Sequence, residues 1–269
     1  FQPTELVKLF TVMYASDYVL RKSKQMRTIV KGFFPMLGVM IVTGWLVYVE
    51  PDLGALIVIT TITIGILFLG GLTLRVIFSL AVLAPIGVWG AILISPYKQK
   101  RIQGFLEPWA PENVFNSGLQ TTQAQMAFGN GEFFGVGVGN SSAKLLFLPE
   151  AHTDFILAII GEEFGLFGVS IVIGLFVFLV VRMFGIAKES IQNNKHFAAL
   201  MAQGIAIWFA IQCVINMAVN LGLFPTKGLT LPLLSFGGSS VLVSVIAIAI
   251  VLRIDHENRR NLRGQYYNK

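Results

Sequence analysis

Long apolar runs, bounded by charged or turn-forming residues, recur along this chain. A helix that crosses a membrane needs about 20 mostly apolar residues, and seven runs approach that length. The first run is the least regular because it contains Glu5, Lys8 and Asp17. The seven predicted helices are Pro3–Leu20, Phe33–Val49, Leu53–Gly70, Leu74–Ile94, Phe155–Met183, Phe197–Leu221 and Leu234–Leu252. The pattern predicts an all-α, polytopic membrane helix bundle.

The composition agrees with a membrane protein and argues against other classes. Of the 269 residues, 55% are apolar and 13% are charged, whereas soluble domains carry about 25% charged residues. A single cysteine, Cys213, excludes an internal disulfide. The formal charge of +6 is spread over short basic clusters between apolar runs, which indicates membrane orientation and argues against nucleic acid as a partner. We therefore expect one membrane domain over residues 1–269.

Lys and Arg accumulate in cytoplasmic loops, so their distribution predicts the orientation of the chain. Basic residues follow the first, fifth and last predicted helices, and the last cluster forms a basic cytoplasmic tail at 253–269. The long loop from Ser95 to Asp154 then lies outside the cytoplasm. This loop is rich in aromatic residues and glycine, so it is expected to fold into short or re-entrant helices on the membrane face. The chain also starts inside a helical segment, and we expect its true N-terminus to lie upstream.

Ionisable residues in or beside membrane helices are candidates for function because burying a charge is costly. Asp154 stands out, since it lies at the extracytoplasmic start of a predicted helix, where unpaired N–H groups favour an anion. It is either the N-cap of that helix or, if Thr153 is the cap, an acid that faces a cavity. The small residues that share its helix face are Ala158, Gly161, Gly165 and Gly168. That face is expected to pack closely against another helix.

Two glutamates follow Asp154 along the same predicted helix. Glu162 lies about 80° away from Asp154 and roughly 12 Å deeper, while Glu163 points to the opposite side. An internal ion pair between one of them and a lysine such as Lys8 explains them at least as well as catalysis does.

Glycine-rich segments invite comparison with anion-binding loops. Gly129–Gly131 and Gly135–Ser141 lack the preceding strand and the following helix of a nucleotide-binding loop, so that interpretation is rejected. Ser235–Ser240 precedes or opens the last apolar helix and forms either a phosphate-binding nest or a tight turn between helices. The three histidines are scattered, without the spacing of a zinc site.

Several motifs together, in their order along the chain, resemble the SEDS proteins (shape, elongation, division, sporulation). The motifs are Gln2-Pro3-Thr4-Glu5 with Lys8, Pro51-Asp52-Leu53-Gly54, Leu148-Pro149-Glu150-Ala151-His152-Thr153-Asp154-Phe155, Ile160-Gly161-Glu162-Glu163-Phe164-Gly165, Pro225-Thr226-Lys227-Gly228-Leu229-Thr230-Leu231-Pro232 and Ser235-Phe236-Gly237-Gly238-Ser239-Ser240. The Pro225 run resembles the cell-division branch of the family. The resemblance covers the whole chain and implies a bundle of about ten membrane helices, of which about seven are present here.

The resemblance also implies a function. SEDS proteins are peptidoglycan glycosyltransferases that polymerise lipid II into lipid-linked glycan at the outer face of the cytoplasmic (inner) membrane. They work with a class B penicillin-binding protein, a transpeptidase, and in this branch with other division proteins at the septum. The family's essential acid maps onto Asp154. The candidate substrate-binding residues are Lys8, Glu5, His152, Thr153, Lys227, Ser239 and Ser240.

Elementary chemistry is consistent with that activity. Lipid pyrophosphate leaves as a stable anion, so one carboxylate acting as general base suffices for an inverting displacement. No organic cofactor is expected. The negative charge of the pyrophosphate leaves room for a divalent cation, Mg²⁺ or Mn²⁺.

Two other functions stay open at the level of the sequence. A lipid II flippase would use Glu5, Lys8, Glu162 and Glu163 as a polar path across the membrane. A non-catalytic division scaffold would need Asp154 only as a helix cap. The long extracytoplasmic loop beside a lone acid favours chemistry outside the membrane.

Overall fold

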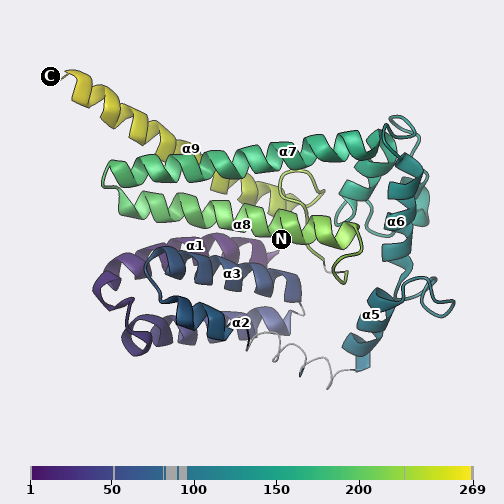
Figure 1. The fold of residues 1–269 in the computed structure, drawn as a ribbon, viewed down its shortest axis with the longest axis horizontal. Coiled ribbons are helices and arrows are strands. Elements are labelled where there is room, and N and C mark those ends of the chain that lie inside the picture. Colours follow the sequence, from purple (N-terminus) through teal and green to yellow (C-terminus); the bar gives the residue numbers. More distant parts are fainter. Residues whose placement is uncertain are drawn as a thin grey trace. The chain divides into compact units, whose positions relative to one another are not determined.

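The computed structural model describes residues 2–50, 52–80, 82, 90, 96–226 and 228–267, and the regular structure within these ranges is helical (Figure 1). Four helices are long and apolar enough to cross a membrane, at Ile29–Val49, Ile156–Gln192, His196–Asn220 and Gly238–Arg260. A shorter apolar helix covers Leu53–Leu69. The prediction of an all-α membrane protein is confirmed. Most of the predicted helix at 74–94 lies outside the described residues.

The chain divides into two compact units. Unit 1 consists of Phe1–Ser79, Val177–Ile211 and Gly238–Lys269, and unit 2 consists of Leu80–Phe176 and Gln212–Gly237. The helices α7 (Ile156–Gln192) and α8 (His196–Asn220) contribute residues to both units.

Unit 1 contains the helices α1 (Pro3–Arg21), α2 (Phe34–Val49) and α3 (Leu53–Leu69), with α3 packed against both others (Figure 1). The short helices η1 (Ser23–Gln25) and η2 (Ile29–Phe33) connect α1 to α2. Proline at the first position of α1 suits a helix start, because its missing N–H would have no partner there. The Asp52 carboxylate accepts the N–H of Ala55 at 2.9 Å and so caps α3.

The last helix, α9 (Gly238–Tyr267), has different bounds from those predicted. It starts after Leu234 because Ser235 closes a turn, donating its N–H to the carbonyl of Leu231. It extends through the predicted tail, where the ion pairs Arg253–Glu257 and Asp255–Arg259, both at 2.9 Å and spaced i, i+4, support a polar helix. The segment at 253–267 is therefore helical.

Unit 2 contains the segment 95–154, which was predicted to form short helices. The structure confirms such helices, namely α5 (Pro96–Leu106), α6 (Leu119–Gly131) and the π-helix η3 (Ala143–Phe147). The end of α6 touches the backbone of α7, since a Cβ on Gly131 would lie 1.9 Å from the Gly161 carbonyl oxygen. The predicted close packing of the small-residue face of α7 is confirmed at this point.

Helix α7 is interrupted at Gly165, which has φ 65° and ψ −164°. Glycine suits this position because other residues rarely adopt positive φ. Backbone groups freed by the interruption bond to the chain that follows α6. These bonds, at 2.9–3.1 Å, join Val136 to Glu162, Gly137 to Glu163, Leu166 to Glu132 and Phe167 to Phe133. Non-helical backbone at membrane depth needs such internal partners, and here the loop after α6 supplies them.

Candidate functional site

Asp154 lies in a tight turn that immediately precedes α7. The N–H groups of Thr153, Asp154 and Phe155 all donate to the carbonyl of Glu150, at 3.1–3.2 Å. Glu150 itself has a positive φ of 58°. The Asp154 side chain is half-buried, and a Cβ on Gly228 would lie 3.6 Å from its Oδ2 atom. Two segments of backbone, the turn at 150–155 and the chain at Gly228, therefore flank the acid.

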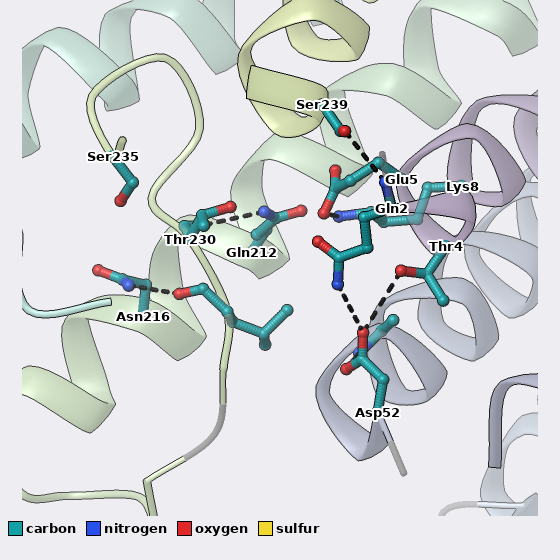
Figure 2. A network of polar contacts seen from close by, with 12 residues as sticks. Gln2, Thr4, Glu5, Lys8, Asp52, Gln212, Asn216, Thr230, Ser235 and Ser239 are labelled. Carbon is teal, nitrogen blue, oxygen red and sulfur yellow. Dashed lines mark hydrogen bonds and ion pairs between the residues drawn. The ribbon is translucent and has the colours of Figure 1, made fainter. Parts of the chain in front are cut away.

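Two asparagines of α8 hold the backbone of Asp154 in place. Nδ2 of Asn216 donates to the Asp154 carbonyl at 2.9 Å and to the Leu229 carbonyl at 2.7 Å, and the second of these bonds is drawn in Figure 2. Nδ2 of Asn220 donates to the same Asp154 carbonyl at 2.9 Å, while its Oδ1 accepts the N–H of Ala158 at 3.1 Å. Both asparagines are buried. We call Asp154, Asn216, Asn220 and Leu229 the Asp154 cluster.

The Thr153 side chain bears on one of the two predictions made for the start of α7. The Thr153 hydroxyl donates to Glu150, at 2.6 Å to the carboxylate and 3.1 Å to the carbonyl, so the prediction that Thr153 caps the helix is wrong. Asn220 satisfies the N–H of Ala158 from a different helix instead. Sequence reasoning missed both asparagines. Their signal was two amides spaced i, i+4 in an otherwise apolar helix.

The segment 229–236 is tied to the same region of unit 2. The carbonyl of the exposed residue His152 accepts the N–H of Phe236 at 2.9 Å. Nε2 of Gln212 donates to the Thr230 carbonyl at 2.8 Å (Figure 2), and the Ser235 hydroxyl accepts the N–H of Leu231 at 2.7 Å. Of the two alternatives for Ser235–Ser240, these contacts support the tight turn. Lys227, a predicted substrate-binding residue, lies outside the described residues.

A second polar group, which we call the Lys8 cluster, lies in unit 1 (Figure 2). Lys8 is fully buried, with Nζ 2.7 Å from Oε1 of Glu5 and 5.3 Å from the centre of the Trp208 ring. The Ser239 hydroxyl accepts the N–H of Gln2 at 3.0 Å. The Asp52 carboxylate accepts bonds from Gln2 and Thr4, both at 3.4 Å. Of the predicted substrate-binding residues, Glu5, Lys8 and Ser239 thus come together, and Ser240 is buried on the same turn of α9.

Glu162 and Glu163 have other partners than the one predicted. Glu162 is 2% exposed and accepts hydrogen bonds from Asn130, Ser141, Ser142 and the N–H of Ala143. Glu163 forms an ion pair with Lys144 at 2.7 Å. The prediction of an internal ion pair is therefore confirmed for Glu163, but Lys8 as the lysine is wrong. Lys144 lies in η3, and its distance from α7 depends on how the loop before η3 folds.

Comparison with known proteins identifies the family. The family model of cell cycle proteins named for FtsW, RodA and SpoVE matches residues 1–260. The chain belongs to this family. It is a multi-pass membrane protein, and the resemblance to the SEDS proteins is confirmed.

Curated relatives in this family carry a functional name. The chain is 49% identical over 263 residues to the probable peptidoglycan glycosyltransferase FtsW of Aromatoleum aromaticum. The matched region covers 98% of this chain and 64% of the relative. It is 47% identical over 264 residues to the protein of the same name from Nitrosomonas europaea, with 98% and 68% covered. The chain therefore spans about two thirds of the length of these relatives.

Solved structures share the fold. A chain of a peptidoglycan synthase complex, described as coordinating polymerization and crosslinking, matches with a TM-score of 0.75 at 26% identity, over 96% of this chain and 70% of that one. The rod shape determining protein RodA of Thermus thermophilus matches with a TM-score of 0.61 at 24% identity, over 96% and 66%. The second likeness concerns the fold alone.

Within the described ranges, no three His, Cys, Asp or Glu side chains gather in a way that could hold a metal ion. Mg²⁺ commonly binds through one or two carboxylates together with substrate phosphates, so a cation that arrives with a pyrophosphate does not need a larger protein cluster.

Proposed function

We propose that this protein is a peptidoglycan glycosyltransferase that polymerises lipid II at the outer face of the cytoplasmic membrane during cell division. The proposal is supported by family membership and by the names of relatives that are 47–49% identical over 98% of the chain. Within this activity, Asp154 is the proposed general base, and the division septum is the proposed location.

The reaction needs few protein groups. A sugar hydroxyl oxygen attacks the anomeric carbon of the donor, a new glycosidic C–O bond forms, and the C–O bond to lipid pyrophosphate breaks with inversion. The Asp154 carboxylate accepts the proton of the attacking hydroxyl, and the pyrophosphate leaves as an anion with the bonding electron pair. No general acid is required, because the leaving group is stable without a proton.

The way in which Asp154 is held is the observation that carries this assignment. Asn216 and Asn220 both bond to its main-chain carbonyl, and Asn220 also fixes the first turn of α7. The half-buried carboxylate therefore stands on a backbone that has little freedom to shift. A general base works best when it is positioned before the substrate binds, since misplacement by about 1 Å can cost about 100-fold in rate.

The negative charge of the pyrophosphate needs a cation, and Lys8 and Lys144 are poorly suited to supply it alone. Lys8 is paired with Glu5, and Lys144 with Glu163, each at 2.7 Å, so each pair is close to neutral. A divalent cation, Mg²⁺ or Mn²⁺, would supply positive charge to the phosphate oxygens when bound. Substrate contacts by Glu5, Lys8, His152, Thr153, Lys227, Ser239 and Ser240 remain part of the proposal.

A class B penicillin-binding protein is the proposed partner, together with other division proteins. The solved synthase complex that resembles this chain joins polymerization and crosslinking. The helices α2 and α7 also expose large apolar side chains, such as Trp45 at 66% and Phe178 at 69%. In a membrane, such surfaces suit lipid or the membrane anchor of a partner.

Replacing Asp154 by asparagine tests the proposed function. Asp154→Asn keeps the size of the side chain but cannot accept a proton, so polymerisation of labelled lipid II by the full-length protein with its partner should fall by about 10²–10⁴. Lipid II binding, co-purification with the partner and melting temperature should change little. The control Glu163→Gln alters a carboxylate held by Lys144 and should keep polymerising.

Other outcomes separate the competing functions. Near wild-type polymerisation by Asp154→Asn would reject this residue as the base. If the wild-type protein with its partner moves lipid II across vesicle membranes without forming glycan, the result would favour a flippase. If it does neither, the result would favour a scaffold.

A further inference from the structure

Unit 2 contains a cavity of about 1120 Å³ that belongs to neither polar cluster. Its walls come from α5, from the turn that follows α5 and from the first residues of α6, with Pro149 and Thr226 on a further side. Small-molecule sites usually enclose about 300–1,000 Å³, so this volume suits an extended ligand.

The chemistry of the walls indicates a polar ligand with little net charge. Lys100 and Arg101 face the cavity together with Glu107 and Glu112, so the formal charges balance. The other polar groups are amides and hydroxyls, contributed by Gln103, Asn113, Asn116, Ser117, Gln120 and Thr226. A pyrophosphate site would need an excess of positive charge. Amides and hydroxyls in this number instead match the hydroxyl and N-acetyl groups of amino sugars, which both donate and accept hydrogen bonds.

Some of these side chains build the wall and others are available to a ligand. Nδ2 of Asn113 donates to the Glu107 carbonyl at 3.0 Å, and Nδ2 of Asn116 donates to the Glu112 carbonyl at 2.9 Å, which fixes the turn. Among the described residues, the side chains of Lys100, Gln103 and Gln120 form no hydrogen bond or ion pair. A rigid wall with unused donors and acceptors is suited to bind a ligand at low entropic cost.

Two lining residues connect the cavity to the Asp154 cluster within unit 2. Pro149 directly precedes Glu150, whose carbonyl accepts the N–H of Asp154 at 3.1 Å. Thr226 lies in the segment that leads to Gly228, and a Cβ on Gly228 would lie 3.6 Å from Oδ2 of Asp154. The backbone that flanks the acid thus also closes one side of the cavity.

We infer that this cavity binds a chain of N-acetylated sugars next to Asp154, with Gln103 and Gln120 as hydrogen-bonding residues. The inference rests on the proposed function, and it names a binding site for the sugars of that reaction. The same sugars occur in the headgroup of lipid II and in the growing glycan, so the test uses one probe for each source.

The test measures equilibrium binding to the full-length protein in detergent. One probe is a fluorescent, soluble, uncrosslinked glycan strand, and the other is a lipid II analogue with a short, soluble prenyl chain. The double variant Gln103→Ala/Gln120→Ala should bind at least one probe about tenfold more weakly, because each lost hydrogen bond weakens binding about two- to tenfold. The control Gln123→Ala removes the same side chain from α6 at a position that does not line the cavity, and it should bind as the wild type does.

Each outcome bears on the inference. Weaker binding of the glycan strand assigns the cavity to the polymer, and weaker binding of the lipid II analogue alone assigns it to the donor headgroup. Unchanged binding of both probes by the double variant would overturn the inference. A double variant that binds both probes normally but no longer co-purifies with the partner would overturn it as well. Asp154→Asn should bind both probes normally, so a failure of the proposed base and a failure of this site give different results.

Discussion

Asp154 and Glu162 are two carboxylates near the start of α7, and they differ in burial and in the hydrogen bonds that position them. At Glu162 the carboxylate itself is held, by side-chain and backbone donors between Asn130 and Ala143, and it is 2% exposed. At Asp154 the amides of Asn216 and Asn220 hold the main-chain carbonyl, and the side chain is half-buried.

The difference separates a structural acid from a candidate catalytic acid. A carboxylate surrounded by donors is stabilised as the anion, and its bonds tie two parts of the chain together. A general base must instead meet a substrate proton, so the protein gains from fixing the backbone beneath it. Burial and hydrogen bonding, more than position along the helix, therefore decide which acid is suited to chemistry.

The comparison predicts that Glu162 matters more for stability than Asp154 or Glu163 does. Glu162→Gln replaces one acceptor oxygen by an NH₂ group, which then faces donors such as the N–H of Ala143 or the hydroxyl of Ser142. Burying opposed donors should lower the free energy of unfolding by about 2–3 kcal/mol. Thermal unfolding of the purified protein measures this loss. An unchanged melting temperature would show that the hydrogen bonds to the Glu162 carboxylate do not contribute to stability.

Substitutions of Asn220 test whether its hydrogen bond to the Asp154 carbonyl contributes to activity, in addition to its role in capping α7. Asn220→Asp keeps an oxygen that can accept the N–H of Ala158 but loses the donor to the Asp154 carbonyl, whereas Asn220→Ala loses both. We expect polymerisation to fall about tenfold in both variants, with kcat affected more than KM. Asn220→Ala should also lose about 1 kcal/mol of stability. Asn220→Asp should lose more, because its second oxygen is buried against the carbonyls of Asp154 and Asn216. Wild-type activity in Asn220→Asp would reduce Asn220 to a capping residue.

The sequence was sufficient to predict the four helices of the described residues that are long and apolar enough to cross a membrane, because length and hydropathy determine them almost alone. It also singled out Asp154, since an acid at a helix start is visible without tertiary structure. It did not reveal Asn216 and Asn220 as partners, because amides in an apolar helix show no preferred target until the neighbouring turn is placed. The interruption at Gly165 was missed for the same reason, as its bonds go to a loop whose fold has no periodic signal.

The ion pair between Lys144 and Glu163 provides the smallest test of the comparison. Its atoms lie 2.7 Å apart, but the two side chains are 25% and 12% exposed, so water offsets part of the attraction. Lys144→Met should therefore cost about 0.5–1 kcal/mol of stability and leave polymerisation close to wild type.

The control is Lys188→Met, at an exposed lysine for which the described residues show no ion pair, and it should cost less stability. A double-mutant cycle with Glu163→Gln isolates the coupling energy. A coupling energy as large as the stability lost in Glu162→Gln would show that partial exposure does not weaken the interactions of a carboxylate. Exposure would then no longer distinguish Asp154 from Glu162.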